Sequence, residues 1–235
     1  MKMSHVLKVK KQMRRKQLYH LLFMASGILS IIFVLITFYG QNAGNFVMTV
    51  DYDAYKRGIV LSKDESFRDP SSQLMTRAVD SAIDMNYTWL KLDEVVLANG
   101  NYIDPDFDYI AYTFHVKNNG SETVNVGYHI RITDVYKNMD AAIRVLVIEE
   151  GVETVYKKPD SPVGGVPVSE SPDNVKPVHF LTDTIVTRKR FQNFKPGDTR
   201  KFSIVIWIEG TDPDTVDDIL GGMVKLQMIF AIDNG

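Results

Sequence analysis

The feature that most constrains the fold is an uncharged stretch of 19 residues, from Leu21 to Tyr39. As a helix rising about 1.5 Å per residue, it would extend roughly 28 Å, close to the thickness of a bilayer's hydrocarbon core. Residues 1–20 before it contain seven lysines and arginines and no acid. Because flanking cations stay on the cytoplasmic side, we predict a basic cytoplasmic tail over 1–20 and a single transmembrane anchor over 21–40.

The same region predicts a lipid partner. We assign bilayer contact to residues 21–39 and expect the cations before them to contact anionic lipid headgroups. These cations are Lys8, Lys10, Lys11, Arg14, Arg15 and Lys16. The alternative is a cleaved signal peptide ending near Ala43, in which Gln41 would occupy a position that favours a small side chain. We therefore favour a retained anchor, with residues 41–235 outside the cell membrane.

Charge is divided unevenly along the chain. The whole sequence has 27 basic and 29 acidic residues, and without the seven cations of 1–20 the counts become 20 and 29. An acidic body repels phosphates, so we predict no nucleic-acid partner. The chain has no cysteine, which excludes disulfides, thiolate metal sites and cysteine nucleophiles.

Beyond residue 44, apolar residues mostly alternate with polar ones, which is typical of half-buried strands. Residues 45–52 predict a first strand. Residues 108–132 predict a hairpin turning at 118–121, in which Val116 pairs with Val124. Residues 142–158 predict a second hairpin, turning near Gly151.

The rest of the body predicts more strands and little helix. Residues 69–85 have the spacing of a short helix or a loop, and the stretch 159–177, rich in Pro, Gly and Ser, predicts a mobile surface loop. Two strands joined by the turn 195–198 follow, with Trp207 as a core residue, and 223–232 predicts the last strand. The fold class is therefore mainly β, an antiparallel β-sandwich with one or two short helices.

Several acids follow the strand that contains Trp207. Asp212 can cap a short helix whose first position is Pro213, since proline needs no amide partner there. Carboxylates at this spacing also attract calcium. We predict the helix and no metal site, and we keep Glu209, Asp212 and Asp214 as weak calcium candidates.

Catalytic motifs are missing from the sequence. There is no H-E-x-x-H and no G-x-S-x-G. In the predicted hairpin, His115 and His129 lie roughly 13 Å apart, too far to share an ion. We therefore predict no catalytic residue, no cofactor and no enzyme.

Four segments resemble a known family. They are YTFHVKNNG at 112–120, FKPGD at 194–198, FSIVIWIEGTDPD at 202–214 and GGMVKLQMIF at 221–230. With them, most of 20–232 resembles uncharacterised Gram-positive surface proteins related to camelysin and to biofilm-matrix fibre subunits. The resemblance implies a jelly-roll-like sandwich outside the cell. Camelysin is described as a zinc peptidase, and the fibre formers are released from the membrane.

Three functions remain as expectations. The first is a membrane-anchored, non-enzymatic surface protein that binds a cell-wall component or a protein partner, or has a structural role. The second is a secreted fibre or matrix subunit in which residues 44–52, freed by signal cleavage, complete a neighbour's sheet. The third is a camelysin-like metallopeptidase, which would need bound zinc.

Overall fold

The computed structural model describes residues 19–34, 44–159 and 176–233. The chain divides into two compact units, 1–43 and 44–235. The buried residues of both hydrophobic cores lie between Phe46 and Phe230, inside the second unit. The second unit therefore has the cores of an independent domain.

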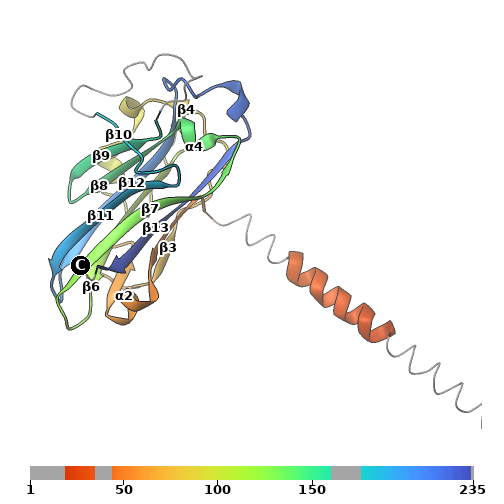
Figure 1. The fold of residues 1–235 in the computed structure, drawn as a ribbon, viewed down its shortest axis with the longest axis horizontal. Helices are drawn as coiled ribbons and strands as arrows, with labels where there is room; N and C mark the ends of the chain where they lie inside the picture. The colour runs from red at the N-terminus through yellow and green to blue at the C-terminus, as the bar shows by residue number, and fades with distance from the viewer. Residues whose placement is uncertain (1–18, 35–43, 160–175, 234–235) are drawn as a thin grey trace, which may run out of the picture. The chain divides into compact units, whose positions relative to one another are not determined.

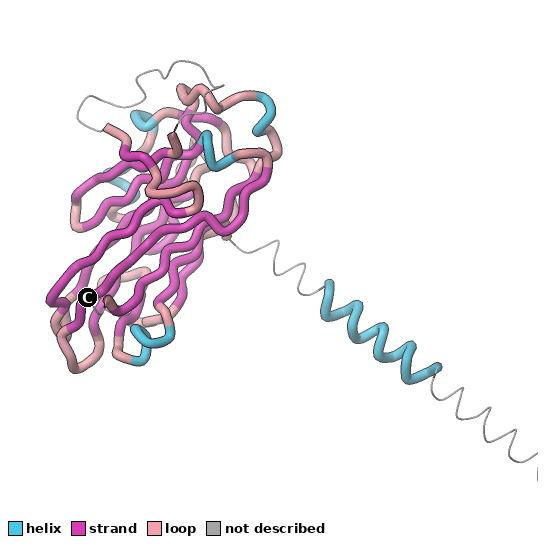
Figure 2. Tube along the Cα trace, in the orientation of Figure 1, coloured by secondary structure: helices cyan, strands magenta, loops and turns pink. Residues whose placement is uncertain are grey.

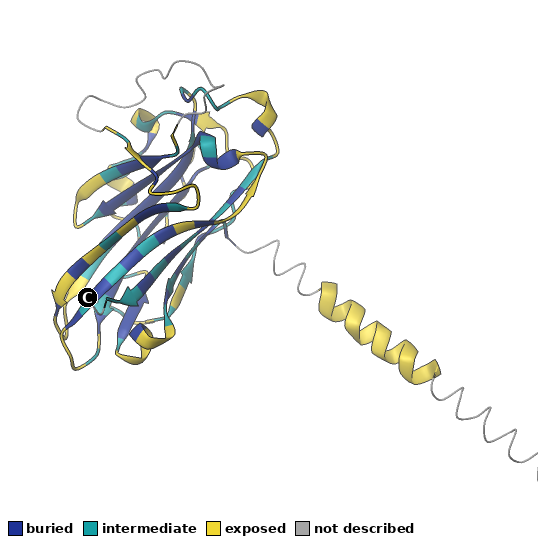
Figure 3. Cartoon of the chain, in the orientation of Figure 1, coloured by how far each residue is buried: buried dark blue, intermediate teal, exposed yellow. Residues whose placement is uncertain are grey.

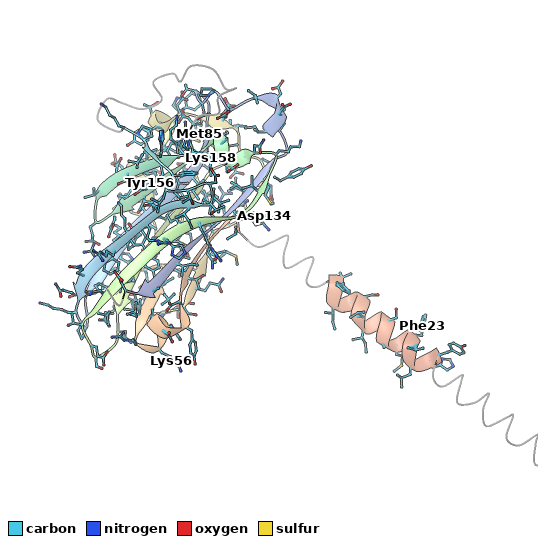
Figure 4. All side chains as sticks on the ribbon, in the orientation of Figure 1. Phe23, Lys56, Met85, Asp134, Tyr156 and Lys158 are labelled. Atoms are coloured by element: carbon cyan, nitrogen blue, oxygen red, sulfur yellow. The ribbon has the colours of Figure 1, made fainter. Side chains whose placement is uncertain are left out.

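The first unit contains a helix over residues 19–34. Its apolar side chains are exposed, with 82% of Phe23 accessible (Figures 3 and 4). Among the described residues, no helix is both long and apolar enough to cross a membrane. The predicted anchor continues to residue 40, and residues 35–40 lie outside the described part, as do 1–18 of the predicted tail.

The second unit is built from two β-sheets (Figures 1 and 2). The first sheet has the strand order β11 (Ile185–Phe194), β7 (Val124–Tyr136), β13 (Met223–Ile232), β1 (Phe46–Val50) and β3 (Gln73–Met75). The second has the order β10 (Val178–His179), β9 (Val152–Lys157), β8 (Ile143–Glu149), β12 (Thr199–Glu209), β6 (Ile110–Asn118) and β2 (Ile59–Ser62). Two short strands extend it: β4 (Asp84–Met85) pairs with β12 and β5 (Gly100–Asn101) with β6.

The two sheets pack face to face around one core. Alternate side chains of each strand point inward, so Phe114 and Phe202 of the second sheet meet Tyr128 and Phe230 of the first. The ring centroids lie 6.1 Å apart for Phe114 and Phe230 and 5.3 Å apart for Tyr128 and Phe202. The predicted mainly-β class is confirmed, and the layers form a sandwich.

The sequence predicted an antiparallel sandwich, but some strand pairs are parallel. The predicted first strand exists as β1, but it runs parallel to β13, with Phe46 beside Leu226. The β9–β10 and β4–β12 pairs are also parallel. A parallel pair needs no tight turn, so strands at opposite ends of the domain can meet without a local sequence signal.

One predicted hairpin is confirmed and the other is wrong. β8 and β9 turn at Glu150 and Gly151, whose φ angles of 50° and 82° are those of a tight hairpin turn. By contrast, β6 and β7 belong to different sheets, so Val116 does not pair with Val124. Alternation shows which face of a strand is buried, and it does not show which sheet holds the strand.

The helices of the domain are short. They are α2 (Tyr52–Lys56), η1 (Tyr87–Trp89), α3 (Leu92–Val95), α4 (Met139–Ala142) and η2 (Asp217–Ile219). The segment 69–85 holds β3 and β4 and no helix, so the helix considered there is wrong. The helix expected after Asp212 is reduced to the single 3₁₀ turn η2. The Asp212 carboxylate instead accepts a hydrogen bond from the Arg144 guanidinium. The predicted loop 159–177 lies mostly outside the described residues.

A second core covers the outer face of the second sheet. Residues from η1, α3 and their flanking loops pack on outward-facing Leu146, Val205 and Trp207. Trp207 is 2% exposed, which confirms it as a core residue. The outer face of the first sheet instead carries half-buried and exposed side chains on β7, β11 and β13. That face is the open side of the sandwich.

Candidate functional site

A groove of about 490 Å³ lies on the open face of the first sheet. It is lined by Gly127, Tyr128, His129, Arg188, Lys189, Arg190, Ala231, Ile232 and Asp233. Gly127 lies in register between Arg190 on β11 and Ala231 on β13. The groove forms because the central position of this row has no side chain. We call it the Gly127 groove.

The Gly127 groove is positively charged. On the open face its lining has two cations, Arg188 and Arg190, against one acid, Asp233, whereas Lys189 pairs in register with buried Tyr128 and its Nζ lies 5.9 Å from the centroid of the Tyr156 ring. Nη1 of Arg190 lies 3.6 Å from the Asp233 carboxylate, whereas exposed Arg188 forms no ion pair with a described residue. A cationic surface is notable in a body that holds 20 basic and 29 acidic residues.

His129 pairs in register with Arg188, two residues along the strands from the pair of Gly127 and Arg190. Burial lowers the pKa of His129, and the charges of Arg188 and Arg131 lower it further. Arg131 is held in place by two hydrogen bonds that it donates to Oε1 of Gln227, at 3.2 and 2.8 Å. His129 is therefore neutral at pH 7 and offers one hydrogen-bond donor and one acceptor.

A second group of polar residues is buried under the loop that follows β12. The Arg144 guanidinium on β8 donates to the Asp212 carboxylate, and each side chain is 1% exposed. Glu209 accepts hydrogen bonds from Nε1 of Trp207 and from the Thr211 hydroxyl, both at 2.9 Å. We call this set the Arg144 cluster.

Lysines border the Arg144 cluster at the ends of β8 and β9. Nζ of Lys157 lies 4.0 Å from the Asp212 carboxylate, and Lys158 donates to Asp140 at 2.6 Å. Figure 4 shows Lys158 at the same end of the domain as Met85, away from Lys56. Buried ionic groups of this kind fix the position of a loop, since each charge needs its partner. We read the cluster as structural.

The weak calcium candidates fall inside or next to this cluster. Asp212 accepts the Asp214 amide at 2.7 Å as well as the Arg144 guanidinium, so it caps a turn and not a helix. Burial raises the pKa of Glu209, although hydrogen bonds and the Arg144 charge oppose the shift. The described residues hold no group of three or more His, Asp or Glu side chains placed to share a metal ion. Calcium would compete here with Arg144, and the absence of a metal site stays a prediction.

The two histidines of the predicted hairpin are on different sheets. His115 lies on the outer face of β6, 7% exposed, in edge contact with Phe67. Its Nδ1 has no hydrogen-bond partner among the described residues. Burial lowers the pKa of His115, and the charge of Lys201 adds to this. His115 and His129 therefore do not form one site.

Sequence reasoning missed both the Gly127 groove and Arg144. Gly127 did give a signal, since a glycine between apolar strand residues indicates a bulge or a gap in the side-chain layer. Arg144 gave none, because its partner Asp212 is 68 residues away and pairs with it only through the fold.

Comparisons with known proteins add little. No family model and no curated protein matches the chain. A β-glucosidase from Kluyveromyces marxianus in complex with glucose has a TM-score of 0.25 and 11% identity, over 75% of this chain and 16% of that one. The selenomethionine-labelled β-glucosidase from the same organism gives 0.24 and 12% over the same shares. Likeness at this level carries no argument about function.

Proposed function

We propose that the chain is a membrane-anchored, extracytoplasmic β-sandwich protein of a Gram-positive bacterium, with a non-enzymatic binding or structural role at the cell surface. The proposal rests on the order of three segments along the sequence. Seven cations precede the uncharged residues 21–39, and the first strand of the sandwich begins soon after, at Phe46. This order is typical of a single-pass anchor with its N-terminus in the cytoplasm.

The exposed helix supports the anchor. In the described helical part of 21–39, the side chains of Phe23, Leu29 and Phe33 are each more than half accessible. A contiguous apolar surface of this kind favours lipid or a protein partner over water. With residues 35–39 added, the stretch would reach the length that a bilayer requires.

The Gly127 groove supports binding over catalysis. Its lining includes one carboxylate, Asp233, and no serine, threonine or cysteine. Glycoside hydrolysis generally needs two carboxylates, and acyl transfer needs a nucleophile beside a base. Cations around a hollow instead suit the recognition of a negatively charged partner.

The jelly-roll-like topology implied by the family resemblance belongs to this proposal too. The chain crosses between sheets from β6 to β7, from β11 to β12 and again from β12 to β13. Repeated crossing of this kind supports a Greek-key or jelly-roll connection.

Protease treatment of intact cells tests the proposed topology. With one epitope tag at the N-terminus and another at the C-terminus, we expect protease to remove the C-terminal tag and leave the N-terminal tag in the membrane fraction. If both tags survive in intact cells and are lost only after lysis, the domain is intracellular and the proposal fails.

The fibre alternative also has an observation in its favour. β1 is the first strand of the domain and lies between β13 and β3, with Phe46, Met48 and Val50 buried. A β1 from another copy could make the same contacts. It ranks second because β1 here completes its own sheet. Polymerisation of residues 44–235 that is abolished by deleting 44–52 would favour it, and a monomer at high concentration would reject it.

A further inference from the structure

Two small residues, Gly127 and Ala231, form the floor of the Gly127 groove. Gly127 and Ala231 are neighbours in register across β7 and β13. A Cβ atom added to Gly127 would have no neighbour nearer than 3.8 Å, the distance to Cβ of Asp233. Space above the backbone of Gly127 is therefore open.

The walls of the groove differ in charge. Arg188 and Arg190 point to the same side of β11. Because they are two residues apart along the strand, their Cα atoms are about 6.6 Å apart. Arg190 already faces Asp233 at 3.6 Å, whereas Arg188 has no ion pair with a described residue and stands beside neutral His129. One end thus offers the Arg188 guanidinium, and the other offers the Asp233 carboxylate with Arg190 beside it.

We propose that the Gly127 groove binds an acidic saccharide, with the sugar ring on Gly127 and Ala231 and its carboxylate at Arg188. The guanidinium fork matches a carboxylate, and His129 can donate a second hydrogen bond to it. The Asp233 carboxylate can accept hydrogen bonds from sugar hydroxyls. The inference rests on the proposed binding role, and it names the class of ligand for that role.

Asp233 argues against a densely charged polymer. A chain with a negative charge at every unit would bring a second charge beside Asp233 and meet repulsion there. One acid group and several hydroxyls fit the lining better.

A competing explanation for the cations is protection of a sheet edge. β11 is an edge strand, and edge strands often carry lysine and arginine that prevent pairing with other chains. This explanation accounts for Arg188 and Arg190 without any ligand. It does not account for the hollow at Gly127, so a change at Gly127 separates the two.

The test measures calorimetric binding of an aldobiouronic acid, a disaccharide with a single carboxylate, to residues 44–235, with neutral maltose as the comparison. The domain excludes the cations of 1–20 and keeps both cores. We expect saturable binding of the acidic sugar only. Gly127→Val, which fills the hollow without changing charge, and Arg188→Gln should each weaken it about tenfold. Lys225→Gln, a matched loss of charge on β13 outside the groove, should change it less than about twofold.

Three results would overturn the assignment. They are no binding by the unaltered domain, equal binding by Gly127→Val, and equal binding of short polyphosphate or single-stranded DNA, which would indicate a general polyanion surface. Thermal unfolding checks that each variant is folded, and Gly127→Ala serves if the valine variant is not. A domain that binds the sugar but is absent from the cell surface would refute the proposed location and leave the groove assignment intact.

Discussion

At the scale of single residues, the domain buries an ion pair between Arg144 and Asp212. Arg144 is the largest fully buried side chain of the described residues. The sequence placed Asp212 correctly as a group that binds backbone amides, because that role is local. It could not show Arg144 as its partner, because the pair depends on how β8 meets the loop after β12.

Removal of Arg144 should be strongly destabilising. We expect Arg144→Met to lower the free energy of unfolding by about 3–5 kcal/mol, since it leaves the buried Asp212 carboxylate without its guanidinium partner. Urea denaturation of residues 44–235 measures this. The matched control is Arg57→Met, which removes an exposed ion pair with Glu122 and should cost about 1 kcal/mol or less. Similar losses for both variants would contradict the structural reading of the cluster.

His115 should make stability depend on pH. Burial and Lys201 hold its folded pKa below the ordinary value of 6.5, against the opposing charges of Glu65, Asp64 and Glu150. The unfolded chain therefore binds the proton first, so stability is full above pH 6.5 and falls as pH drops below it.

The measurement for His115 is urea denaturation at pH 7.5 and at pH values below 6.5. His115→Gln should flatten the loss of stability on acidification, although not abolish it, because the pKa of His129 is lowered in the same direction. An unchanged pH profile in the variant would show that His115 is not protonated on unfolding.

At the scale of elements, strands were predictable, and of their partners the sequence predicted the β8–β9 pair alone. Alternating residues located β1, β6, β7 and β13, and the Glu150–Gly151 turn fixed the β8–β9 hairpin. The loop after β6 has the glycine and asparagines of a hairpin, yet it crosses to the other sheet. Asn118 stabilises that crossing by donating to the backbone oxygens of Glu122 and Phe194, both at 2.8 Å. Nothing in the local pattern distinguishes this arch from a hairpin.

Gly120 should be essential to the β6–β7 crossing. A Cβ atom there would collide with the carbonyl oxygen of Arg57, which is backbone and cannot move aside easily. We expect Gly120→Ala to lower the free energy of unfolding by about 1–3 kcal/mol. Gly127→Ala is the matched control, since its Cβ meets only ordinary contacts, and it should remain within about 1 kcal/mol of the unaltered domain. Equal stability of the two variants in thermal unfolding would argue against the crossing.

At the scale of the whole molecule, composition and charge predicted more than motifs did. The division into a basic N-terminal part and an acidic body was visible in the sequence, and the structure separates compact units after residue 43. The Gly127 groove was not visible, because β7, β11 and β13 contribute to it from distant parts of the chain. Arg188, Arg190 and His129 look like ordinary solvent-facing strand positions until the register brings them together.

The most direct test of the proposed anchor is the intact mass and N-terminal sequence of the mature protein, recovered separately from cytosol, membrane and medium. We predict the full-length chain, found in the membrane fraction alone. A chain in the medium that begins near residues 41–45 would contradict a retained anchor and make the fibre subunit the leading explanation.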